Sequence, residues 1–177
     1  MENKEKYTAS HIANYFLWRA WKEQIDITQM KLMKLVCISY GWNLVMNDNK
    51  KLFEEPILAW KYGLVIPSIY HEFKEFRNNP ITKGNYSFIF TDYKEDGAIK
   101  GLEVPTIRED DTHILKILNA EWNNYKDFDS IELSEIFDED YILWIKAKQQ
   151  GINTRLDDED IKQQSLKIIN KLMENEN

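Results

Sequence analysis

The chain has 177 residues, enough for one domain that buries about two thirds of the surface exposed by its unfolded form. A hydrophobic fraction of 43% and an aromatic fraction of 13% exclude an intrinsically disordered chain, although 30% of the residues are charged. The 30 acidic and 23 basic residues give a formal charge of −7, which argues against direct nucleic-acid binding because phosphate contacts need clustered Lys and Arg. We therefore expect a folded protein that does not bind nucleic acid directly.

Cysteine usage and hydropathy indicate the compartment. Cys37 is the single cysteine and lies within an apolar segment, so no intrachain disulfide can form and a reducing compartment is favoured. The first residues, MENKEKY, lack the apolar segment of a signal peptide. No apolar run approaches the ~18 residues expected of a membrane span. The sequence thus predicts a cytoplasmic protein that does not enter a membrane.

Two helices are predicted at the start of the chain. Thr8 and Ser10 are candidate N-caps for a helix over residues 9–23. Thr28 is placed to cap a second helix that ends near Met46. Its apolar residues recur three, four and seven apart in two stripes, which predicts a central helix with neighbours on two sides.

In the next segment, turn residues appear and the helical spacing of apolar residues gives way to a strand pattern. Residues 57–61 fit either an extended piece or a short helical turn, whereas Pro67 suits the first turn of a short helix over residues 68–78. After Pro80, β-branched and aromatic residues over 86–104 predict a β-hairpin with its turn near Asp96 and Gly97.

Helical spacing returns in the C-terminal half. We expect helices that begin at Thr106 or Asp110, at Ser130 as a cap, and at Asp138, the last of these ending at Gly151 in a left-handed conformation. Residues 156–173 predict a final amphipathic helix. No repeat or linker divides the chain. The predicted fold is mainly α: a single compact domain over residues 1–177 with about seven helices and one small β-hairpin insertion.

Residues 28–76 carry a resemblance to a known family. The stretches KLMKLVCISYGWNL and KLFEEPILAWKYGLVIPSIYHEFKEF contain a Lys-Leu-rich helix, a Leu-Phe pair, an Ala-Trp pair and a glycine-proline turn before a Tyr-bearing helix. This order resembles the Panacea domain, the family of SocA-like antitoxins and phage-associated proteins. Further on, SIELSEIF (residues 130–137) resembles the family's Leu-Ser helix. Leu64 replaces the family's usual turn proline, and the histidine that usually follows the Leu-Ser helix is absent near Phe137 and Asp138.

The resemblance implies a small cytoplasmic protein that neutralises a toxic protein partner by direct contact, often encoded beside it on a prophage or other mobile element. Some relatives look like adaptors that deliver the bound toxin to a protease. The partner differs widely within the family, so residues 85–104 are expected to be the partner-specific part. An alternative function is inhibition of a host defence effector, such as a nucleic-acid enzyme, by an acidic surface that imitates phosphate charge.

The residues themselves offer little for an enzyme. His11, His71 and His113 fall on separate predicted helices, and Glu75 occupies the position where a zincin-like His71-Glu72 pair needs its second histidine. Cys37 is flanked by apolar residues, which favours a core thiol over a nucleophile. The acidic run over 157–160 is expected to cap a helix rather than to bind metal. We therefore predict a non-enzymatic protein with no cofactor and no metal site.

Six aromatic residues are candidate partner contacts, because aromatic side chains anchor protein interfaces when they reach the surface. They are Trp60, Tyr62, Tyr70, Tyr86, Phe88 and Trp144. The competing interpretation is that aromatic residues at helical spacing belong to the core, and that a motif shared by relatives with different partners maintains the scaffold.

Overall fold

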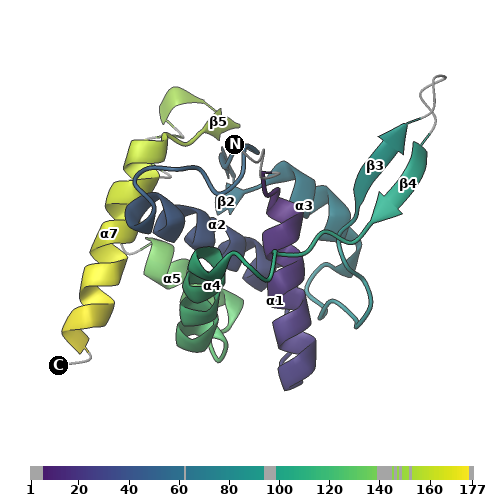
Figure 1. Cartoon of the computed structure of the whole chain (residues 1–177). Helices are drawn as coiled ribbons and strands as arrows, with labels where there is room; N and C mark the ends of the chain where they lie inside the picture. Colours follow the sequence, from purple (N-terminus) through teal and green to yellow (C-terminus); the bar gives the residue numbers. More distant parts are fainter. Residues whose placement is uncertain are drawn as a thin grey trace.

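Helices make up most of the molecule, and a β-hairpin extends away from them (Figure 1). The computed structural model describes residues 6–61, 63–93, 99–138, 145, 147, 149–151 and 153–175. The helices described are α1 (Ala9–Glu23), α2 (Gln29–Met46), α3 (Pro67–Phe73), the short 3-10 helix η1 (Lys74–Phe76), α4 (Thr112–Tyr125), α5 (Ser130–Asp138) and α7 (Asp158–Asn175). The mainly α fold class is confirmed.

The first two helices begin and end where the sequence predicts. At the start of α1 the Thr8 backbone N–H donates to His11 Nδ1 over 3.1 Å. At the start of α2 the Thr28 hydroxyl accepts from the backbone N–H of Lys31 over 3.3 Å, as an N-cap side chain does. The cap fixes the position at which the central helix begins.

Helix α2 is the centre of the packing. It contacts α1, α3, α4, α5, α7 and strand β2, and every residue from Lys31 to Leu44 is buried. Burial on all sides explains why its apolar residues form two stripes instead of one. The predicted central helix with neighbours on two sides is confirmed.

A small antiparallel sheet follows α2. Strands β1 (Leu58–Trp60), β2 (Gly63–Val65) and β5 (Thr154–Arg155) pair in the order β2-β1-β5, so residues 57–61 adopt the extended alternative. Ala59 pairs with Leu64 on one side and with Thr154 on the other. The sequence did not predict β5 or the sheet, because a two-residue strand has no period of its own and depends on pairing across the chain.

The predicted hairpin is confirmed as strands β3 (Ile89–Tyr93) and β4 (Ile99–Glu103), whose antiparallel register is irregular between Phe90 and Tyr93. The predicted turn near Asp96 and Gly97 lies outside the described residues. In Figure 1 the hairpin points away from the helices, at the upper right.

Two predicted helix starts were wrong by small shifts. Helix α4 begins after Asp111, whose side chain accepts from the Ile114 N–H, rather than at Thr106 or Asp110. Asp129, not Ser130, caps α5 by accepting from the N–H groups of Ile131 and Glu132. In each case a neighbouring carboxylate, a strong cap, takes the place of the predicted residue.

The helix predicted over residues 68–78 is shorter in the structure. Helix α3 ends at Phe73 and continues as η1, and Arg77 then takes a positive φ of 53°. Its predicted inner face is confirmed, because Ile69 and Phe73 are buried and Tyr70 and Phe76 pack against the core.

At the C-terminal end, most of the predicted helix from Asp138 to Gly151 lies outside the described residues. Gly151 has a φ of 127°, the left-handed conformation predicted for it. Helix α7 is confirmed and packs closely on α2: a Cβ atom built on Gly41 would lie 1.9 Å from Ser165 Oγ. Gly41 therefore permits the approach of these two helices.

Candidate protein-binding surfaces

The structure brings together two of the six predicted contact residues. The Trp60 ring on β1 and the Tyr70 ring on α3 meet edge to face with centroids 4.9 Å apart, and His71 lies 5.4 Å from Tyr70. Both Trp60 and Tyr70 are partly exposed. Tyr62 lies outside the described residues. The motif thus forms a half-buried aromatic cluster of Trp60, Tyr70 and His71, which fits both of the interpretations made from the sequence.

Tyr86 and Phe88 lie at the base of the hairpin. The Tyr86 ring packs edge-on against Trp21 of α1 at a centroid distance of 4.8 Å, while Phe88 is 40% exposed. Phe88 is therefore the more accessible of the two. Trp144 lies outside the described residues.

Asn14 on α1 holds the base of the hairpin through buried hydrogen bonds. Its carboxamide NH₂ donates to the carbonyl oxygens of Ser87 and Pro105 over 2.9 and 3.0 Å, and its carbonyl oxygen accepts from the Ser87 N–H over 2.8 Å. Ser87 precedes β3 and Pro105 follows β4, so one side chain fixes both ends of the hairpin. We call Asn14, Ser87 and Pro105 the hairpin anchor. The sequence offered no signal for it, because a single Asn within a helix has no distinguishing pattern.

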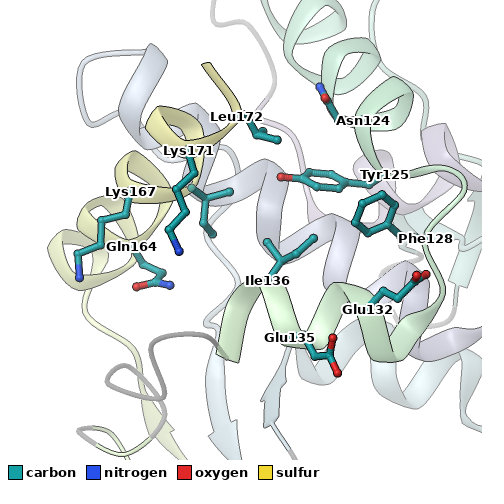
Figure 2. A pocket seen from close by; sticks show the side chains of 11 residues that line it. Asn124, Tyr125, Phe128, Glu132, Glu135, Ile136, Gln164, Lys167, Lys171 and Leu172 are labelled. Atoms are coloured by element: carbon teal, nitrogen blue, oxygen red, sulfur yellow. The ribbon is translucent and has the colours of Figure 1, made fainter. Parts of the chain in front are cut away.

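A groove of about 410 Å³ lies between α4, α5 and α7, at a place the sequence did not predict (Figure 2). Its apolar lining comes from all three helices and from the loop between α4 and α5, and consists of Tyr125, Phe128, Ile136, Ile168 and Leu172. Exposed Glu132 and Glu135 lie on the α5 side, and exposed Lys167 and Lys171 lie on the α7 side. We call this feature the α4–α5–α7 groove. Its only sequence signals were the amphipathic period of residues 156–173 and the spacing of the two lysines.

Tyr125 gives this groove a buried polar group. The residue is 1% exposed, and its hydroxyl has no hydrogen-bond partner among the described residues. Figure 2 shows the ring directed across the groove toward α7. Burial, with a smaller effect of the Glu121 charge, raises the pKa of the phenol above its ordinary value. The hydroxyl therefore remains protonated and able to donate.

The buried polar residues of the motif support the scaffold. The Lys31 ammonium donates to the carbonyl oxygen of Lys126, at the negative end of the α4 dipole. The Ser39 hydroxyl lies 2.6 Å from Glu121 Oε2 and 3.0 Å from the Leu35 carbonyl oxygen. These contacts join α2 to α4. Holding α2 against α4, rather than binding a ligand, accounts for the polar groups at these positions.

Glu121 is fully buried, and burial raises its pKa well above the ordinary value of 4.5. Ser39 has a single hydroxyl proton but lies within hydrogen-bond distance of two acceptors. The Ser39 hydroxyl is the donor in both contacts, so its proton is shared between Glu121 Oε2 and the Leu35 carbonyl oxygen. Burial thus favours the protonated form of this carboxyl group, and the Ser39 hydrogen bond opposes that effect in part.

The groups considered for catalysis are kept apart. His11 caps α1, His71 belongs to the aromatic cluster, and His113 lies in a separate pocket beside Arg108. Cys37 is buried, as predicted, and burial raises its pKa to about 12. A thiol in that state is a poor nucleophile at neutral pH.

The acidic run has the structural role predicted for it. Asp157 Oδ1 accepts from the N–H groups of Glu159 and Asp160 at the start of α7. Asp158 accepts from the Tyr40 hydroxyl over 2.8 Å and pairs with Lys51. Within the part of the chain that the structure describes, no three His, Cys, Asp or Glu side chains form a group that could hold a metal ion.

Fold and surfaces together define a small helical scaffold with an anchored hairpin and with a groove that has acidic residues on one side and basic residues on the other. In the described ranges, no helix combines the length and apolarity needed to cross a membrane. The chain belongs to the SocA-like antitoxin family, because the family model "Antitoxin SocA-like, Panacea domain" matches residues 32–145. No curated protein and no solved structure matches the chain. The resemblance drawn from residues 28–76 is thereby confirmed.

Proposed function

We propose that this protein is an antitoxin that neutralises a cognate toxin by direct protein–protein contact and has no catalytic step of its own. The observation that carries the proposal is the match to the SocA-like antitoxin family over residues 32–145. The scaffold role of Lys31 and Ser39 supports it, since these polar residues of the motif bind Lys126 and Glu121 and hold α2 against α4. We propose that residues 1–177 act as one domain in this role.

The contact surface proposed from the sequence comprises aromatic residues in the β1–β2 segment, on α3, at the hairpin and, in the sequence, after α5. These residues are Trp60, Tyr62, Tyr70, Tyr86, Phe88 and Trp144. Support for the hairpin part comes from its projection from the helices (Figure 1) and from the 40% exposure of Phe88. Support for Trp60 and Tyr70 comes from their partial exposure and their mutual contact.

Co-expression with the product of the adjacent gene tests the proposal. We expect this chain to restore growth to cells expressing the neighbouring gene, and the two purified proteins to co-elute in size-exclusion chromatography. A Phe88→Ala variant should weaken the complex if the hairpin contributes, while Trp18→Ala, an exposed aromatic on the body of α1, is the matched control. Independent elution together with no rescue would falsify the proposal.

Delivery of the toxin to a protease is a further form of the same proposal. It predicts that the half-life of the toxin shortens when this chain is present and lengthens again when the protease is inactivated. Rescue that persists without the protease, with an unchanged toxin half-life, indicates neutralisation by contact alone.

The second candidate is a phage- or mobile-element-encoded inhibitor of a host defence effector that acts on nucleic acid. The formal charge of −7 favours it, because an acidic surface can occupy a site built for phosphate. It predicts that the purified chain inhibits such an enzyme, that inhibition weakens as salt rises, and that the adjacent gene product is not bound. Binding to the adjacent gene product and no effect on host nucleases favours the antitoxin.

A further inference from the structure

We propose that the α4–α5–α7 groove binds an amphipathic helix of the protein partner, with acidic side chains of that helix facing α7 and basic side chains facing α5. The inference rests on the proposed function, because it assumes a protein partner, and it adds where and in what form that partner binds. The groove lies outside the six aromatic residues proposed as contacts from the sequence.

The lining of the groove suits an apolar helix face. Five apolar or aromatic side chains converge from three helices and from the loop between α4 and α5, namely Tyr125, Phe128, Ile136, Ile168 and Leu172. A volume of about 410 Å³ accommodates several side chains. A helix laid in such a groove inserts residues at i, i+3, i+4 and i+7 as anchors.

The charges on the two sides select a helix over other occupants. Lys167 and Lys171 are four residues apart on α7, and Glu132 and Glu135 are three apart on α5, so each pair repeats after about one turn, or ~5.4 Å. A second helix lying alongside presents its own side chains at the same repeat. Figure 2 shows the lysines on α7 and the glutamates on α5 lining different sides of the groove. A partner helix with one acidic and one basic edge is therefore complementary in both charge and spacing.

The Tyr125 hydroxyl gives the groove a polar group that can select among partners. Its oxygen is buried at the groove and has no hydrogen-bond partner among the described residues. An unpaired buried hydroxyl costs free energy that a partner oxygen can recover on binding. The partner helix is thus expected to place a carboxylate, an amide or a hydroxyl oxygen there. Gln164, also buried and lining the groove, offers a second polar group.

Charge reversal in the complex with the adjacent gene product tests the proposal. The variant Lys167→Glu/Lys171→Glu should weaken the complex about tenfold or more, because two attractive charges on the α7 edge become repulsive. The matched control is Lys116→Glu/Lys162→Glu, which makes the same change in net charge at lysines that do not line the groove. The control should bind within about twofold of the native chain.

The variant Tyr125→Phe separates binding from folding. Removing an unpartnered hydroxyl should leave the melting temperature of the free chain unchanged or higher, while the complex weakens about fivefold or more because a hydrogen bond made only on binding is lost. A purely structural role of Tyr125 predicts no change in affinity.

Photocross-linking identifies the bound segment. A benzoylphenylalanine at position 128 should cross-link to an amphipathic helix of the partner, and the same group at Ile131, which is 67% exposed and does not line the groove, should not. Reversing the acidic residues of that helix should restore binding to Lys167→Glu/Lys171→Glu.

The outcomes distinguish the two levels of the proposal. If the native chain does not bind the adjacent gene product, the proposed antitoxin function fails. If it binds, but the groove variants bind within twofold of the control and position 128 does not cross-link, the groove inference fails alone. A cross-link to a second copy of this chain, or to a non-helical segment, also overturns it.

Discussion

Loss of the hairpin anchor should release the hairpin and destabilise the protein. In Asn14→Ala, the Ser87 N–H and the carbonyl oxygens of Ser87 and Pro105 each lose a hydrogen bond in a buried setting. Each lost bond costs about 1–1.5 kcal/mol, and the higher helix propensity of Ala returns about 0.5 kcal/mol. The three bonds together give an expected loss of about 3 kcal/mol in the free energy of unfolding.

Two measurements check this value. Urea denaturation gives the loss in global stability, and hydrogen exchange should show the amides of β3 and β4 exchanging about a hundredfold faster, the rate equivalent of about 3 kcal/mol, while those of α2 change less. Asn124→Ala is the matched control, since Asn124 is an exposed helical Asn with one hydrogen bond to the Ala120 carbonyl, and it should change stability by about 0.5 kcal/mol or less. A loss below about 1 kcal/mol with unchanged hairpin exchange would refute the anchoring role.

Three other predictions follow from buried groups. Burial raises the pKa of Glu121, so the folded state keeps a proton that the unfolded chain loses, and the free energy of unfolding should fall as pH rises above about 4.5. The variant Glu121→Gln should remove this pH dependence. Equal pH slopes of the urea midpoint in the native chain and the variant would contradict the prediction. The variant Gly41→Ala should lower the free energy of unfolding by about 1–2 kcal/mol, although Ala has the higher helix propensity, because the added Cβ would lie 1.9 Å from Ser165 Oγ. In a double-mutant cycle, Ser165→Ala should recover part of this loss. Burial raises the pKa of Cys37 to about 12, so iodoacetamide should label it only after unfolding, and rapid labelling of the native chain would show that the thiol is accessible.

Part of the candidate contact surface could be predicted from the sequence. Trp60 and Tyr70 were named as contacts and do meet, because they flank a glycine-proline turn that returns the chain on itself. The α4–α5–α7 groove could not be predicted from the sequence, since its lining residues lie between positions 124 and 172 and come from three helices and the α4–α5 loop. Which faces of those helices meet depends on how each packs against α2, and no local pattern encodes that choice.

The sequence by itself determined the helices α1, α2 and α7, the hairpin and the family, because apolar period, capping residues and motif order act over short stretches of chain. Tertiary structure alone decided the pairing of β5 with β1, the attachment of the hairpin to Asn14 and the placement of opposite charges across a groove. Each of these is a contact between residues far apart in the chain. Its free energy comes from burial and hydrogen bonding that exist only after the helices have packed.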